Sequence, residues 1–206
     1  MSNNRVYTYY EFVPGLVRDD AVMMLWRESW QRHGWEPRLL SRHDANRHPR
    51  SEAFMAKVRR FPTRNPANYD LVCWYRWLAF ARAGGGLMTD MDTINHGLTP
   101  DAIQMGAPMI EEMARVPCMV SADAAGAEQI VADILTGTVP PGIDHYSDMI
   151  FFQASGYPHQ ASCRELGHPG WREAGAVHFS RHACRIWNDQ NLTRIQKAGL
   201  IRKLIP

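Results

Sequence analysis

The pattern of apolar and polar positions predicts that the chain begins with a strand, a helix and a second strand. Residues Arg5–Phe12 are rich in β-branched and aromatic side chains, which is typical of a strand. Asp19 or Asp20 can cap a helix whose apolar residues recur at helical spacing until Gly34. Residues Trp35–Leu40 then predict a second strand. This alternation favours an α/β fold.

Two further helices and a short buried strand are predicted before the middle of the chain. Residues Ser51–Phe61 predict a short basic helix that ends before a proline. An Asn-Pro pair begins a helix over residues 65–83, and its apolar side chains surround most of the helix axis, so we expect it to be buried. A triple glycine at 84–86 ends this helix, and Leu87–Thr89 predicts a short strand.

The second half of the chain has weaker signals. A loop is expected over residues 136–146, which contain Pro-Pro-Gly. The expected strands are Pro117–Ser121, Met149–Phe152 and Val177–Ser180, and the expected helices are Ala127–Leu135 and Thr193–Ile205. Together these elements predict a single α/β domain over residues 1–206, with a mixed central sheet of the Rossmann kind flanked by helices.

Composition and charge exclude several classes of protein. The 206 residues are 45% hydrophobic, and 23 basic against 21 acidic residues leave a net charge of +2, which argues against a nucleic-acid-binding protein. No apolar run approaches the length of a transmembrane helix, and the first residues lack the apolar core of a signal peptide, so we expect a cytoplasmic protein. Four widely spaced cysteines without a Cys-x-x-Cys pair favour reduced thiols.

The candidate chemistry lies in the segment that follows the triple glycine. Asp90 and Asp92 are two positions apart, so in an extended segment their side chains point to the same face. Two neighbouring carboxylates repel each other unless a cation lies between them, and oxygen ligands suit Mg²⁺ or Mn²⁺. The alternative interpretation is a solvated loop that carries two unrelated aspartates.

The segment from Asp70 to Asp92 resembles the core of nucleotide-sugar glycosyltransferases with the GT-A fold. It reads Asp-Leu-Val-Cys-Trp-Tyr-Arg-Trp-Leu-Ala-Phe-Ala-Arg-Ala-Gly-Gly-Gly-Leu-Met-Thr-Asp-Met-Asp. It is most similar to the sugar-binding DXD-motif transferases of capsule and mannan synthesis, in which a helix with Asp and Arg precedes glycines and a short strand ending in Asp-x-Asp. The resemblance implies a nucleotide-binding part at about 1–100 and an acceptor-side part at about 101–206.

The resemblance also implies a reaction and a donor site. A hexosyltransferase of polysaccharide biosynthesis would move sugar from a UDP- or GDP-linked donor to a glycan or another hydroxyl acceptor. Asp90 and Asp92 would hold Mn²⁺ or Mg²⁺, which neutralises charge on the leaving diphosphate and makes Asp92 a catalytic residue. His178 is expected as a late third metal ligand, with a satisfied core histidine as the alternative. The residues expected to contact the donor are Asp70, Arg76, Gly85, Gly86, Thr8, Tyr9 and Tyr10.

Several of these residues have structural alternatives. Arg76 would form a structural ion pair at the edge of its helix, and Thr8, Tyr9 and Tyr10 would simply pack within the first strand. Asp148, before the expected strand Met149–Phe152, is a candidate general base for the acceptor hydroxyl, with capping as the alternative.

Two rival functions use the same segment. The sequence Asp-Met-Asp-Thr at 90–93 would be the nucleophile motif of a haloacid-dehalogenase-like phosphatase, although that motif usually lies near the start of its domain. A GT-A-like module that binds a nucleotide or glycan without turnover is the non-enzymatic alternative. The basic residues Arg194, Lys197, Arg202 and Lys203 of the last helix would contact anionic lipid at a membrane surface or remain solvated.

Overall fold

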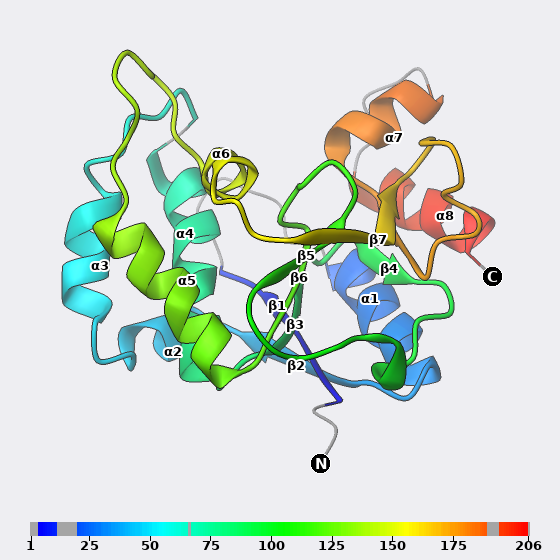
Figure 1. Ribbon diagram of the computed structural model, residues 1–206. Helices are drawn as coiled ribbons and strands as arrows, with labels where there is room; N and C mark the ends of the chain where they lie inside the picture. Colours follow the sequence, from blue (N-terminus) through cyan, green and yellow to red (C-terminus); the bar gives the residue numbers. More distant parts are fainter. Residues whose placement is uncertain (1–3, 12–19, 66, 189–193, 206) are drawn as a thin grey trace.

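The computed structural model describes residues 4–11, 20–65, 67–188 and 194–205, and these form a mixed α/β fold around one eight-stranded sheet (Figure 1). The strands are β1 (Arg5–Tyr9), β2 (Glu36–Leu40), β3 (Gly86–Thr89), β4 (Thr93–Asn95), β5 (Met109–Glu112), β6 (Met119–Ala122), β7 (His159–Glu165) and β8 (Ala176–His178). The predicted mixed sheet flanked by helices is therefore confirmed.

The strands follow the order β2-β1-β3-β6-β5-β7-β8-β4. Strands β2, β1 and β3 are parallel, so their carboxyl ends meet at one edge of the sheet. Strand β6 is antiparallel to both β3 and β5, while β7 is parallel to β5 and β8. Strand β4 is antiparallel to β8, which brings a late segment of the chain next to the residues that follow β3.

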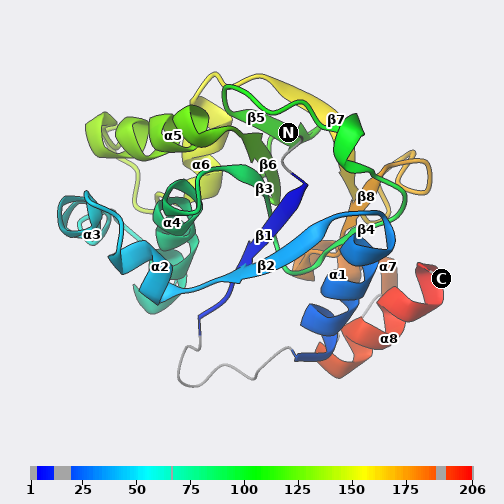
Figure 2. The same ribbon diagram turned by 90° about the horizontal axis from the view of Figure 1, so that it is seen from below.

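Helices cover both faces of the sheet, as Figures 1 and 2 show. One group packs on the face of Tyr7, Met88 and Val120, and the other on the face of Val6, Leu87 and Met119. The first group is α2 (Arg42–Asn46), α3 (Ser51–Val58), α4 (Ala67–Arg82), α5 (Ala124–Thr136) and α6 (Asp148–Ala154). The second group is α1 (Asp20–Arg32), α7 (Arg181–Asn188) and α8 (Arg194–Leu204), and a 3-10 turn, η1, spans Pro100–Ala102. Among the described residues no helix is both long and apolar enough to cross a membrane.

The prediction of a strand at Met149–Phe152 is wrong, because this segment lies within helix α6. Its neighbouring residues Phe151 and Phe152 are both buried, whereas an alternating strand would bury every second residue. Both rings pack against aromatic side chains of α4. A short apolar run has no period that distinguishes a strand from a buried helix.

Three buried tryptophans anchor the end of β3 and the chain that follows it. The indole N–H of Trp26 donates to the Thr89 hydroxyl, at 2.9 Å. The indoles of Trp30 and Trp35 donate to the carbonyls of Thr93 and Leu98, at 3.0 and 2.8 Å. Because each buried indole N–H needs an acceptor, these bonds tie α1 and the residue before β2 to positions on both sides of Asp90 and Asp92.

Candidate metal centre

Two aspartates and one histidine from distant parts of the sequence meet at the end of β3. One ligand atom from each of Asp90, Asp92 and His178 lies within 4.8 Å of the others. The His178 Nε2 atom is 3.6 Å from an Asp90 oxygen and 3.4 Å from an Asp92 oxygen. Two carboxylates and an imidazole form a donor set that suits a divalent transition metal such as Mn²⁺.

Backbone pairing brings these three side chains together. The Asp90 N–H donates to the Cys118 carbonyl at 2.7 Å, and the Thr93 N–H closes a turn on the Asp90 carbonyl at 3.0 Å. Strand β4 follows at once, and its Thr93 pairs with His178 of β8. The Phe179 N–H then donates to the Asp92 carbonyl at 2.8 Å. The strand pair β4–β8 therefore fixes the histidine beside the aspartates.

Arg76 joins the centre to a third carboxylate. The residue is 9% exposed, and its guanidinium forms ion pairs with Asp90 and Asp148. The bond to Asp148 is 2.5 Å, and the Trp77 indole donates to the same carboxylate at 3.2 Å. Asp148 is the first residue of α6 and is 4% exposed, so this buried charge depends on Arg76. A structural ion pair was the alternative interpretation of Arg76, and the structure shows such a pair with Asp90, one of the candidate metal ligands.

Lys197 of α8 is a second cation at the centre. It forms an ion pair with one oxygen of Asp92, while His178 faces the other oxygen. Burial raises the pKa of Asp92, but Lys197 and His178 together hold this pKa below its ordinary value. Asp90, Asp92 and Asp148 carry three negative charges, against two positive charges on Arg76 and Lys197. A neutral His178, the form that binds a metal, therefore leaves one negative charge at the centre.

The pKa values of the buried groups follow from their neighbours. Burial raises the pKa of Asp148, and the nearby Asp90 carboxylate adds to this, although Arg76 opposes both. Burial alone would lower the pKa of His178, but Cys118 and the Asp92 carboxylate raise it well above its ordinary value. A metal at this centre would therefore displace a proton from His178.

One face of α4 lines the centre with residues that the sequence did not single out. Tyr69 and Cys73 precede Arg76 by seven and three positions, which places them on the same side of the helix. The pKa of Tyr69 is raised by the nearby Cys73 thiol, by burial, and by the carboxylates of Asp90 and Asp148. Tyr69 is 50% exposed and is thus the accessible member of this face. Both residues could have been predicted from the sequence, because positions three and seven before Arg76 lie on the same side of a helix.

The candidate nucleotide residues of β1 differ in their accessibility. Thr8 is buried, and its hydroxyl has no partner within the described part of the chain. Tyr9 and Tyr10 are half-buried at the carboxyl end of the strand. The Tyr9 hydroxyl donates to Glu11 at 2.9 Å, and Glu11 is in turn paired with Arg42. Only the two tyrosines therefore have surface to offer a ligand.

The remaining candidates lie apart from the metal centre. Asp70 is buried near the start of α4, where it accepts hydrogen bonds from Thr63 and Asn65. Gly85 and Gly86 lie at the opposite end of β3 from Asp90. A Cβ atom on Gly85 would be 2.5 Å from backbone atoms of residue 123, so close packing explains this glycine. The structure thus gathers Arg76, Asp90, Asp92, Asp148 and His178, and leaves these three residues outside.

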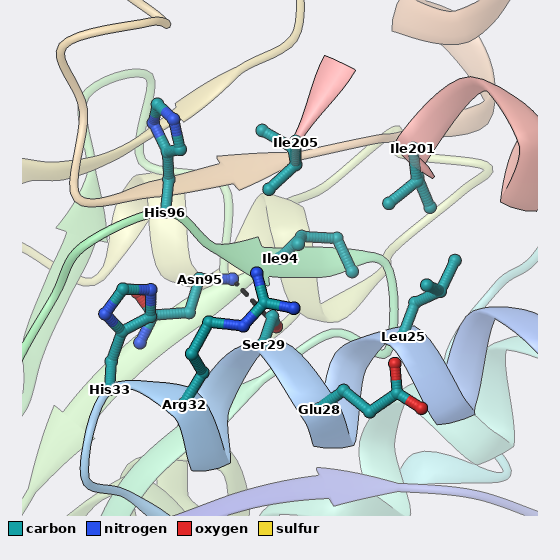
Figure 3. A pocket seen from close by; sticks show the side chains of 10 residues that line it. All are labelled: Leu25, Glu28, Ser29, Arg32, His33, Ile94, Asn95, His96, Ile201 and Ile205. Atoms are coloured by element: carbon teal, nitrogen blue, oxygen red, sulfur yellow. Dashed lines mark hydrogen bonds between the residues drawn. The ribbon is translucent and has the colours of Figure 1, made fainter. Parts of the chain in front are cut away.

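A pocket of about 270 Å³ lies between α1, β4 and α8 (Figure 3). Its apolar wall includes Leu25, Ile94 and Ile201, and its polar rim carries Arg32 and His33. None of the three candidate ligands lines this pocket, so it is distinct from the metal centre.

A comparison with protein families matches residues 2–115 of the 206 to a model described as a domain of unknown function (DUF8765). The matched region contains Arg76, Asp90 and Asp92, whereas Asp148, His178 and Lys197 lie beyond it. A search of curated proteins finds no match to the chain.

Proposed function

This chain belongs to the DUF8765 family, whose description assigns no activity. From the geometry of the site, we propose that the protein is a metal-dependent glycosyltransferase. The substrate would be a nucleoside-diphosphate sugar linked to UDP or GDP, and the acceptor a hydroxyl group on a glycan or another molecule. One observation carries the proposal: His178, from a strand far along the sequence, meets the Asp-x-Asp pair within the reach of one ion.

Asp90, Asp92 and His178 would hold the metal, and Mn²⁺ suits them better than Mg²⁺ because one donor is an imidazole nitrogen. When bound, the ion would supply positive charge that stabilises the leaving diphosphate. Arg76 orients Asp90 through its guanidinium and adds a second positive charge at the same place. Lys197 can exchange its contact with Asp92 for one with a phosphate oxygen.

This proposal gives Asp148 a positioning role in place of the general base considered above. The residue is 4% exposed, and its carboxylate already accepts hydrogen bonds from Arg76 and Trp77. A general base must reach the proton that it removes, and a carboxylate engaged in this way faces the protein interior. Asp148 therefore fixes the direction of Arg76, which in turn fixes Asp90.

Thermal unfolding with and without Mn²⁺ tests the proposal, using UDP- and GDP-sugars one at a time. We expect Mn²⁺ to raise the melting temperature, one class of nucleotide sugar to raise it further, and the donor to be hydrolysed slowly. Asp92→Asn should abolish all three effects, whereas Asp101→Asn, at an exposed position of η1, should leave them intact. Phosphomonoester hydrolysis without any nucleotide effect would support the phosphatase instead, and stabilisation without hydrolysis would support a binding module.

A further inference from the structure

The surface of α7 combines exposed apolar residues with arginines. Ile186 is 67% exposed and Trp187 is 40% exposed, and both lie at the end of this eight-residue helix. Arg181 and Arg185 of the same helix are exposed, as is Arg172 in the loop before β8. Figure 1 shows α7 at the outer edge of the molecule, so this surface is open to a large partner.

Contacts within this surface hold its indole in place. The rings of Trp171 and Trp187 meet edge to face with centroids 5.6 Å apart. The Arg172 guanidinium lies 4.4 Å from the centre of the first ring and 5.9 Å from the second. Because Trp171 is buried, Trp187 rests on a fixed support with its other side in solvent. An amphipathic tryptophan held in this way suits the boundary between water and an apolar phase.

The charge around the apolar residues indicates the partner. Residues 171–188 contain three arginines and one acidic residue, Glu173, so this segment carries net positive charge even with neutral histidines. A bilayer with anionic lipids has negatively charged headgroups above an apolar interior, so it can bind arginines and exposed apolar side chains at the same time. A protein partner would instead need a groove that is complementary in shape to this surface.

We propose that α7 and the adjoining Trp171–Arg172 loop form a docking surface for anionic phospholipid membranes. Ile186 and Trp187 enter the boundary between headgroups and acyl chains, and Arg172, Arg181 and Arg185 contact lipid phosphates. Helix α7 begins three residues after His178, so docking places the metal centre close to the membrane surface. This membrane contact differs from that expected for α8, because Lys197 of that helix is engaged with Asp92.

Vesicle binding tests this surface without reference to catalysis. The full chain is mixed with vesicles of phosphatidylcholine alone, or with roughly one-third phosphatidylglycerol, and bound protein is separated by flotation. We expect binding only to the anionic vesicles, and its loss between about 0.1 M and about 1 M salt. Six of the seven tryptophans are buried, so a blue shift of emission and protection from acrylamide quenching report on Trp187.

Surface variants separate the two parts of the proposal. Ile186→Ser with Trp187→Ser should weaken binding by about tenfold or more, and Arg181→Gln with Arg185→Gln by about fivefold per charge. Met24→Ser is the matched control, because Met24 is 59% exposed on α1. The proposal is overturned if the protein binds both vesicle types equally, or if the variants bind as tightly as the wild type. It is also overturned if self-association protects Trp187 in the absence of vesicles.

Discussion

Replacement of Arg76 by methionine probes the buried ion pairs that this residue forms with Asp90 and Asp148. Arg76 is 9% exposed, and its guanidinium pairs with the carboxylates of Asp90 and of Asp148, a residue that is 4% exposed. Removing one partner of a buried ion pair leaves an uncompensated charge and typically costs about 3–5 kcal/mol. We expect Arg76→Met to lose a stability of this size at neutral pH, measured by urea unfolding.

The pH dependence of this loss identifies its cause. Burial and Asp90 already raise the pKa of Asp148, and removal of Arg76 removes the group that opposes this rise. A carboxyl whose folded-state pKa lies above its unfolded value binds protons more readily in the folded state, so its contribution to stability falls as pH rises. The deficit of Arg76→Met should therefore shrink when the pH is lowered from about 8 to about 5.

Arg82→Met is the matched control, because Arg82 is an exposed arginine of the same helix. It should change the free energy of unfolding by less than about 0.5 kcal/mol at any pH. A loss below about 1 kcal/mol for Arg76→Met, or a loss that grows as the pH falls, would refute the assignment of a buried ion pair that restrains Asp148.

Three further substitutions test other parts of the structure. Gly85→Ala should cost about 3 kcal/mol or more in urea unfolding, because its Cβ would meet backbone at 2.5 Å, whereas Gly84→Ala, with open space around it, should cost about 1 kcal/mol. Asp123→Ala removes the side chain that caps α5 and should cost about 1 kcal/mol by the same assay. Lys197→Met removes the cation paired with Asp92 and should tighten Mn²⁺ binding by about threefold to tenfold in a calorimetric titration. Unchanged Mn²⁺ affinity in that variant would show that the lysine and the metal do not share this carboxylate.

The elements with a clear period could be predicted from the sequence. Apolar residues at helical spacing between the aspartates at 19–20 and Gly34 predict a helix, and the structure places α1 there, with Asp20 as its first residue and Asp19 outside the described residues. The short strand before Asp90 could also be predicted, because a triple glycine precedes it and two carboxylates follow it. In contrast, β7 is largely exposed and polar, so no alternation distinguishes it from a loop.

Spacing in the sequence predicts the local part of the candidate centre, and His178 is expected only through the family resemblance of the segment from Asp70 to Asp92. Asp90 and Asp92 stand two positions apart, and this spacing is visible in the sequence. Lys197 is 105 positions from Asp92, and its helix looks like an ordinary solvated basic helix until the fold brings the two together. Asp148 likewise acquires its role only through Arg76, on a helix 72 positions earlier.

Crystals soaked in Mn²⁺ provide the most direct test of the metal centre, through the anomalous signal of the ion. We predict one strong anomalous peak within coordination distance of Asp90, Asp92 and the His178 imidazole, and no such peak in crystals of Asp92→Asn. A well-ordered structure without a peak among these three side chains, or with the ion bound only elsewhere, would contradict the proposed metal site.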